Sequence, residues 1–151
     1  MNTRTRLVRA AGSVVTTAAC VMLLASMASA ANTSAAAKEI DTAHAHALMA
    51  QTAGTIDMAH AHLHHVINCL VGPKGAGFDT SAENPCKGQG NGAIPDSVTD
   101  QALHNKLQSA LADAQAGLES NSLASVQQDA AKAVAALAAT PVQKPHGGYT
   151  W

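Results

Sequence analysis

Two long stretches of the chain, both free of proline, flank a segment dense in glycine and proline. Residues 35–70 are rich in alanine and leucine and hold a single glycine, whereas residues 71–96 hold six glycines and three prolines. Proline lacks a backbone N–H and glycine loses the most conformational freedom on folding, so neither is common inside helices. The pattern therefore predicts helices on both sides of a long loop, and an all-α fold.

Helical periodicity is clearest in the second stretch. Apolar residues recur there at three- and four-residue intervals, at Leu103, Leu107, Leu111, Ala114 and Leu118 and again at Leu123, Val126, Ala130, Val134 and Leu137. A shift of 67 positions lays Ile56 on Leu123 and Ile67 on Val134. This agreement predicts a four-helix up-down bundle of two duplicated helical hairpins, joined by the loop at 71–96, with helices near 35–53, 55–70, 98–119 and 122–139.

The first hairpin depends on a turn at Gly54. Glycine suits the left-handed position after a helix end, and Thr55 suits the N-cap of the next helix. The alternative is one helix over residues 35–70, whose apolar stripe stays in phase across Gly54, so that phase alone does not decide. The hairpin is favoured because the repeat implies it twice, and because the single helix would extend roughly 54 Å.

The N-terminal segment has the pattern of a secretory signal. Three arginines precede an apolar run over residues 10–27 that ends in Ala28-Ser29-Ala30. We expect residues 1–30 to be a cleaved signal peptide, residues 31–140 the helical domain and residues 141–151 a flexible tail. A lipoprotein site at Cys20 and an uncleaved anchor are less favoured, because the apolar run continues past Cys20 and is short for a span. The signal predicts a periplasmic or secreted protein with no membrane segment after cleavage.

The expected mature chain has no arginine and a net negative charge, which argues against a nucleic-acid partner. Histidine is its unusual residue. The pattern Asp-x-Ala-His-Ala-His occurs at 41–46 and again at 57–62, and His64 and His65 follow. A single histidine is more often solvated or packed than bound to metal. Six between His44 and His65 favour metal binding.

The turn at Gly54 would make distant side chains neighbours. It sets His44 opposite His64, His46 opposite His62 and Met49 opposite Met58, whereas a straight helix would hold His46 roughly 27 Å from His64. Within the second helix, His60 and His64 share one face and His62 and His65 another. The candidate metal ligands are His44, His46, Met49, Met58, His60, His62, His64, His65, His104 and His146.

Two of these candidates lie outside the first hairpin. His104 starts the third helix near the end that carries residues 62–69. His146 lies in Lys144-Pro145-His146-Gly147-Gly148, which resembles the copper-binding octarepeat of prion proteins over four residues, although a disordered terminus explains it as well. Imidazole suits copper, nickel, zinc and cobalt, and thioether sulfur favours Cu(I). No spacing closes a tetrahedral site, so several sites of moderate affinity are expected, with copper as first choice.

Cys69 and Cys86 have two interpretations. A disulfide would tie the glycine-rich loop to the end of the second helix, and an oxidising compartment favours it. The alternative is that Cys69 joins His65 as a thiolate ligand.

At this point the chain resembles the small metal-binding protein family, which are secreted bacterial four-helix bundles with histidines along their helices. The resemblance covers residues 38–139 apart from the loop at 71–96. It implies periplasmic binding of copper and other divalent ions through His44, His46, His60, His62, His64 and His65, with His104 opening the second pair. The chain departs from the family in its long loop, its cysteine pair and a second helix pair that retains only His104.

The sequence predicts a metal-binding protein that buffers, sequesters or delivers a transition metal, and no enzyme, since no nucleophile motif or phosphate loop is found. The first alternative is a four-helix haem protein with histidine and methionine as axial ligands. Covalent attachment is excluded for it because Cys-x-x-Cys-His is missing. The second is an interaction or chaperone-like bundle that uses the loop at 71–96, while the histidines only sense pH.

Overall fold

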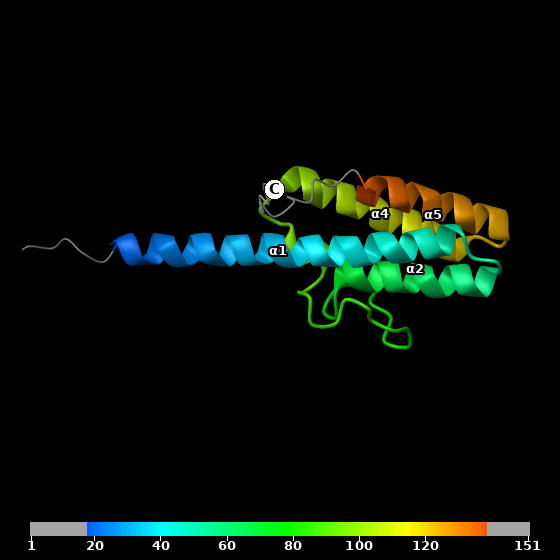
Figure 1. Cartoon of the computed structure of the whole chain (residues 1–151), viewed down its shortest axis with the longest axis horizontal. Helices are drawn as coiled ribbons and strands as arrows, with labels where there is room; N and C mark the ends of the chain where they lie inside the picture. Colours follow the sequence, from blue (N-terminus) through cyan, green and yellow to red (C-terminus); the bar gives the residue numbers. More distant parts are fainter. Residues whose placement is uncertain (1–17, 139–151) are drawn as a thin grey trace, which may run out of the picture.

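The computed structural model describes residues 18–138, and their side chains from Thr33 onward. This part of the chain is entirely helical (Figure 1) and contains no strand. The all-α prediction is therefore confirmed. The helices are α1 (Ala18–Gln51), α2 (Ile56–Val71), α3 (Ala93–Asp96), α4 (Gln101–Glu119) and α5 (Leu123–Ala138).

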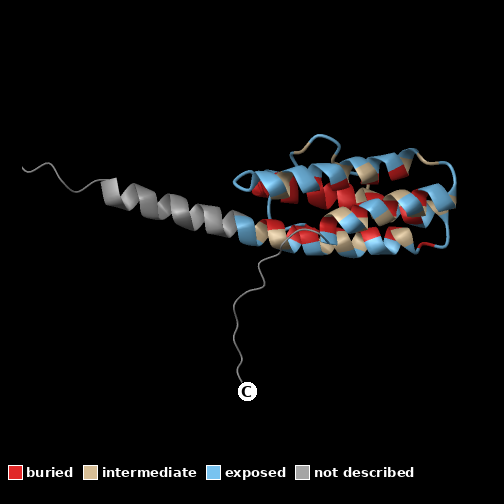
Figure 2. Ribbon diagram, turned by 90° about the horizontal axis from the view of Figure 1, so that it is seen from above, coloured by how far each residue is buried: buried red, intermediate tan, exposed pale blue. Residues whose placement is uncertain are grey.

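The four long helices pack side by side around one core. Helix α1 lies along α2 and α5, and α4 lies along α5 and α2. Their buried faces turn inward (Figure 2), and small residues line them. Ala43, Ala47 and Ala50 of α1 are fully buried, and a Cβ added at Gly117 of α4 would lie 2.5 Å from a methyl carbon of Leu63. Small side chains therefore let the helices approach closely, and Leu63, Leu70, Leu107 and Leu137 are the largest apolar side chains that are fully buried.

The chain turns between Gln51 and Ile56, so the expected break near Gly54 is confirmed and the single helix over residues 35–70 is wrong. As expected, Thr55 caps α2, its hydroxyl accepting a hydrogen bond from the backbone N–H of Met58. The expected left-handed conformation of Gly54 is wrong. Helix α1 instead ends with a 3₁₀-type hydrogen bond from the N–H of Ala53 to the carbonyl of Ala50, three residues earlier. This ending needs no left-handed residue.

The largest differences from the predicted boundaries are in three places, and the other helix ends lie within two residues of the prediction. Helix α1 begins at Ala18 and not near residue 35. Helix α4 begins at Gln101, because Asp100 caps it by accepting from the N–H of Leu103. The segment 71–96, expected to be all loop, ends in the short helix α3.

Two regions with a predicted role lie outside the described residues. They are the first part of the expected signal peptide, residues 1–17, and the C-terminal tail, which contains His146. Among the helices that are described, none combines the length and apolar character needed to cross a membrane.

The loop between α2 and α4 is fixed at both ends by close backbone contacts. Gly72 has φ 68°, and a Cβ there would collide with the backbone of Asn91, so only glycine fits. Gly92, beside it, donates its N–H to Glu39 Oε1 of α1 at 2.8 Å. The end of α2, the last part of the loop and α1 therefore meet at one place.

Glu39 is the buried acid of this junction. It is 1% exposed, and its second oxygen, Oε2, has no hydrogen-bond partner. Burial raises the pKa of Glu39 to about 7, the bond from Gly92 opposes this rise, and the nearby carboxylate of Asp96 adds to it. Glu39 therefore keeps its proton between about pH 4.5 and 7, where an ordinary glutamate is mostly charged.

The raised pKa of Glu39 predicts how the free energy of unfolding changes with pH. A carboxyl whose pKa is about 7 in the folded chain and 4.5 as a free group contributes stability that is complete below pH 4.5 and is lost as the pH rises through 7. Glu39→Gln keeps an oxygen for Gly92 and removes this titration. We expect the free energy of unfolding of the wild type, relative to E39Q, to fall between pH 4.5 and 7. Urea unfolding across this range measures it, and a constant difference would contradict the assignment.

Candidate metal centre

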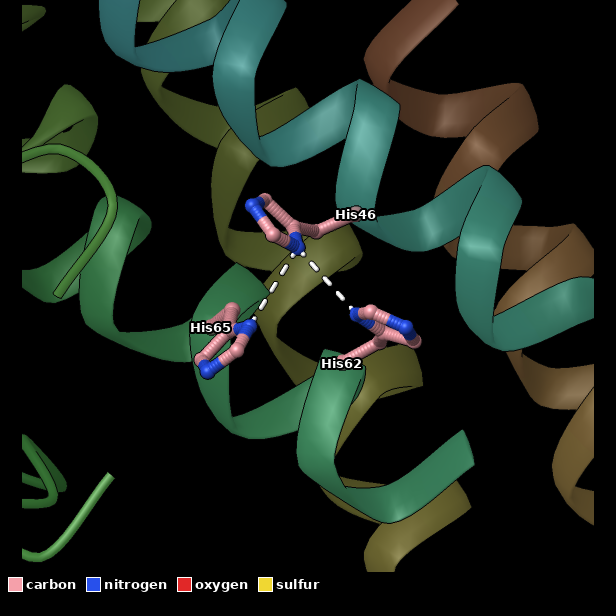
Figure 3. A group of neighbouring side chains, drawn as sticks. All are labelled: His46, His62 and His65. Carbon is pink, nitrogen blue, oxygen red and sulfur yellow. Dashed lines mark hydrogen bonds between the residues drawn. The ribbon is translucent and has the colours of Figure 1, made fainter. Parts of the chain in front are cut away.

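Three histidines meet on the seam between α1 and α2. His46 comes from α1, and His62 and His65 come from α2, one turn apart (Figure 3). His46 Nδ1 lies 3.3 Å from Nδ1 of His62 and 3.3 Å from Nδ1 of His65. One ligand nitrogen from each residue lies within 4.8 Å of the other two, and all three residues are half-buried. We call them the three-histidine cluster.

The spacing of these nitrogens suits a metal ion. In a tetrahedral site with metal–nitrogen bonds of about 2.05 Å, two ligand atoms lie roughly 3.3 Å apart. The rings also avoid face-to-face stacking: His65 stands nearly perpendicular to His46, with ring centroids 4.8 Å apart. His62 and His65 each present Nδ1 to Nδ1 of His46, so nitrogens rather than ring carbons meet at the centre of the cluster, as coordination by lone pairs requires (Figure 3).

The surroundings of the cluster favour neutral imidazoles. Partial burial lowers the pKa of His46, and the neighbouring rings of His65 and His62 lower it further. Burial and His62 lower the pKa of His65 in the same way, while the carboxylate of Glu83 opposes the shift in both residues. Neutral imidazole is the form that binds metal ions, so protons compete less for these two ligands than for a free histidine.

The loop lies against the same part of α2. Asn68, which is fully buried three residues after His65, donates from Nδ2 to the backbone carbonyls of Asp79 and Glu83 and accepts from the N–H of Asp79. The disulfide between Cys69 and Cys86 joins the two segments again. These contacts hold both loop acids near the histidines of α2.

The structure brings His46 and His62 together as the pairing across the turn predicts. It does not place His44, His60 or His64 in the three-histidine cluster. His64 instead forms an ion pair with Asp79, with 3.0 Å between Nδ1 and Oδ2. Nε2 of His60 is buried and has no hydrogen-bond partner. Met49 and Met58 are large exposed apolar residues of the hairpin.

The remaining candidates lie elsewhere. Nδ1 of His104 lies 3.2 Å from the carbonyl oxygen of Ile94 and 3.3 Å from Oγ of Ser97, so its described contacts tie α4 to the segment around α3. The thiolate role of Cys69 is wrong, because its sulfur is bonded to Cys86. The disulfide, which was the favoured interpretation, is the one observed.

Sequence reasoning missed Asn68, Asp79 and Glu83. The signal that could have found the two acids was already in the sequence. A bond between Cys69 and Cys86 brings the residues just before Cys86 to the end of α2, one turn from His65, and Glu83 lies three residues before that cysteine. Asn68 had no such signal, since its partners are backbone groups of the loop.

Comparisons with protein-family models, curated proteins and solved structures give no match. The function is therefore inferred from the geometry of the three-histidine cluster.

The cluster makes a prediction that needs no metal. Because burial and neighbouring imidazoles lower the pKa of His46 and His65 below the ordinary 6.5, their rings should be half-protonated at a lower pH than a free histidine. His62→Ala removes one neighbouring ring, so it should raise the pKa of both residues. A two-dimensional NMR titration of metal-free protein measures this, and ordinary pKa values for both would contradict the packing of the cluster.

Proposed function

We propose that the protein binds a divalent transition-metal ion at His46, His62 and His65, and that it buffers, sequesters or delivers that ion. The observation that carries the proposal is the convergence of three ring nitrogens from two helices, with neighbouring pairs 3.3 Å apart. Histidines that only face solvent do not require ring nitrogens at this distance from one another.

The donor set indicates which ions are suitable. Imidazole nitrogen binds Cu(II), Ni(II), Zn(II) and Co(II), and among divalent ions Cu(II) generally has the highest affinity. Copper therefore stays the first choice, with nickel, zinc and cobalt as the others. The expected secretory signal would place the protein in the periplasm or outside the cell, and we propose binding rather than catalysis as its activity.

The fold suits such a role. We infer that α1 with α2 and α4 with α5 are two related hairpins in a four-helix up-down bundle, supported by the extensive packing within each pair. Only the first hairpin carries the cluster. The second hairpin completes the hydrophobic core against which the histidine-bearing helices pack.

A haem group receives less support from the structure. A cavity of about 710 Å³ lies between the loop and α4, and its apolar walls include Val71, Ile94 and Leu111. Neither a histidine nor a methionine lines it. A cytochrome-like site with these two residues as axial ligands therefore has no counterpart in this cavity.

Metal titration of single variants tests the proposal. We expect the wild type to bind Cu(II), Ni(II) or Zn(II) at one site, and His46→Ala to weaken binding by more than about tenfold, because a lost ligand costs at least as much as a lost supporting contact. His44→Ala is the matched control, since it removes a half-buried histidine two residues away on the same helix. Isothermal titration calorimetry of metal-free protein gives both affinities.

The same variants should separate in thermal melts. An ion that binds only the folded chain raises the melting temperature of the wild type and of H44A, and raises that of H46A less. Absence of binding by the wild type, or equal affinities for H46A and H44A, would refute the proposed site.

A further inference from the structure

The three-histidine cluster leaves a coordination position and a charge to be accounted for. Three imidazoles are neutral ligands, so a bound divalent ion would keep its full charge, and a tetrahedral shell would have one place open. A carboxylate from a nearby acid would fill the open place and neutralise one of the two charges. The argument that follows rests on the metal binding proposed above.

The loop segment 79–89 is anchored on the side of the cluster farther from the hairpin turn. Asn68 and Cys69, which hold Glu83 and Cys86, lie three and four residues after His65. On the other helix, Gln89 Nε2 donates to Oγ1 of Thr42, four residues before His46. The loop thus spans the seam between α1 and α2 one helical turn from the imidazoles.

Two acids lie in this loop segment, and they are engaged differently. Both carboxylate oxygens of Asp79 already have partners. One forms an ion pair with His64, and the other accepts hydrogen bonds from the N–H and the hydroxyl of Ser81. Glu83 is exposed, and within the described residues its carboxylate has no recorded hydrogen bond or ion pair, although its backbone carbonyl is fixed by Asn68 at 3.1 Å. Its backbone is held, whereas its side chain is exposed to solvent.

The backbone of Glu83 is held beside the face of α2 that carries His65, because Asn68, which binds its carbonyl, lies one turn after His65. The ring of His65 in turn lies against that of His46 of α1, with ring centroids 4.8 Å apart. A glutamate side chain with three rotatable bonds can turn from solvent toward such a pair.

We propose that Glu83 is the fourth ligand of the ion held by His46, His62 and His65, carried to the site by the disulfide-anchored loop. The resulting set of three imidazoles and one carboxylate has no sulfur. A hard oxygen donor selects divalent ions and disfavours Cu(I). Met49 and Met58 are then not required for the ion, and the carboxylate leaves water only when an ion arrives to neutralise it.

The test compares Glu83→Gln with Glu119→Gln, a matched control at the exposed end of α4. Zn(II) is the probe, titrated calorimetrically into metal-free full-length chain. We expect E83Q to bind Zn(II) about tenfold more weakly than the wild type, within the range for lost partners of metal ligands. E119Q should bind as the wild type does. Equal affinities of E83Q and the wild type would overturn the assignment.

The salt dependence of the affinity distinguishes direct coordination of the ion by Glu83 from electrostatic attraction through solvent. Charge effects through solvent are screened at about 0.5 M salt, whereas a direct bond to the ion is not. The difference between E83Q and the wild type should therefore persist at high salt, and its disappearance would overturn the role of Glu83 as a ligand. Co(II) adds a second measurement, since its visible absorption depends on the donor atoms and should differ in E83Q but not in E119Q.

Failure of this proposal and failure of the proposed function give different results. If Glu83 is not a ligand, the wild type and E83Q bind Zn(II) equally, and H46A still binds more weakly than H44A. If no ion binds to the wild type, the metal site itself is refuted, and the role of Glu83 falls with it.

Discussion

The register of α1 against α2 is the constraint on which the rest of this molecule depends. The turn between Gln51 and Ile56 is so short that it fixes which residues of the two helices lie side by side, and alanines at 43, 47 and 50 let α1 pack closely. A slip of one residue would rotate a side chain by about 100° around its helix. Imidazoles that now point at one another would then face solvent or the core. The candidate metal centre thus depends on the register of α1 against α2.

The glycine-rich loop is costly to order, because each glycine gives up more backbone freedom than any other residue. Three buried groups offset that cost. Cys69 holds Cys86 covalently, Asn68 bonds to three backbone groups of the loop, and Glu39 accepts from Gly92. Two of the three stand on the last turns of α2, on the same helix as His62 and His65. The loop and the candidate site therefore form one structural unit, and the acids of the loop reach the histidines for that reason.

Much of this could be predicted, but only where the signal is local. Periodicity located the helices, and pairing across the turn predicted the contact of His46 with His62. The same rule paired His64 with His44 and missed His65, because adjacent residues lie about 100° apart and the helix rotation decides which one faces the neighbour. Glu39 and Asn68 gave no signal, since their partners lie 53 and 11–15 residues away along the chain. The cysteine pair carried information over 17 residues, and it could have located Glu83.

The chemistry of the three nitrogens explains why such a cluster suits a cation better than a proton. A neutral imidazole Nδ1 carries either a hydrogen or a lone pair. His46 Nδ1 lies 3.3 Å from both partners, so it can donate to only one of them, or accept from both at a distance long for a hydrogen bond. One proton can therefore be shared in a hydrogen bond by two of the three nitrogens at most. An ion bound as proposed above would accept a lone pair from each of the three, and partial burial adds to this preference by lowering the pKa of His46 and His65. A nitrogen–nitrogen distance of 3.3 Å is thus long for a hydrogen bond, yet it matches the spacing of two ligand atoms on one tetrahedral metal ion.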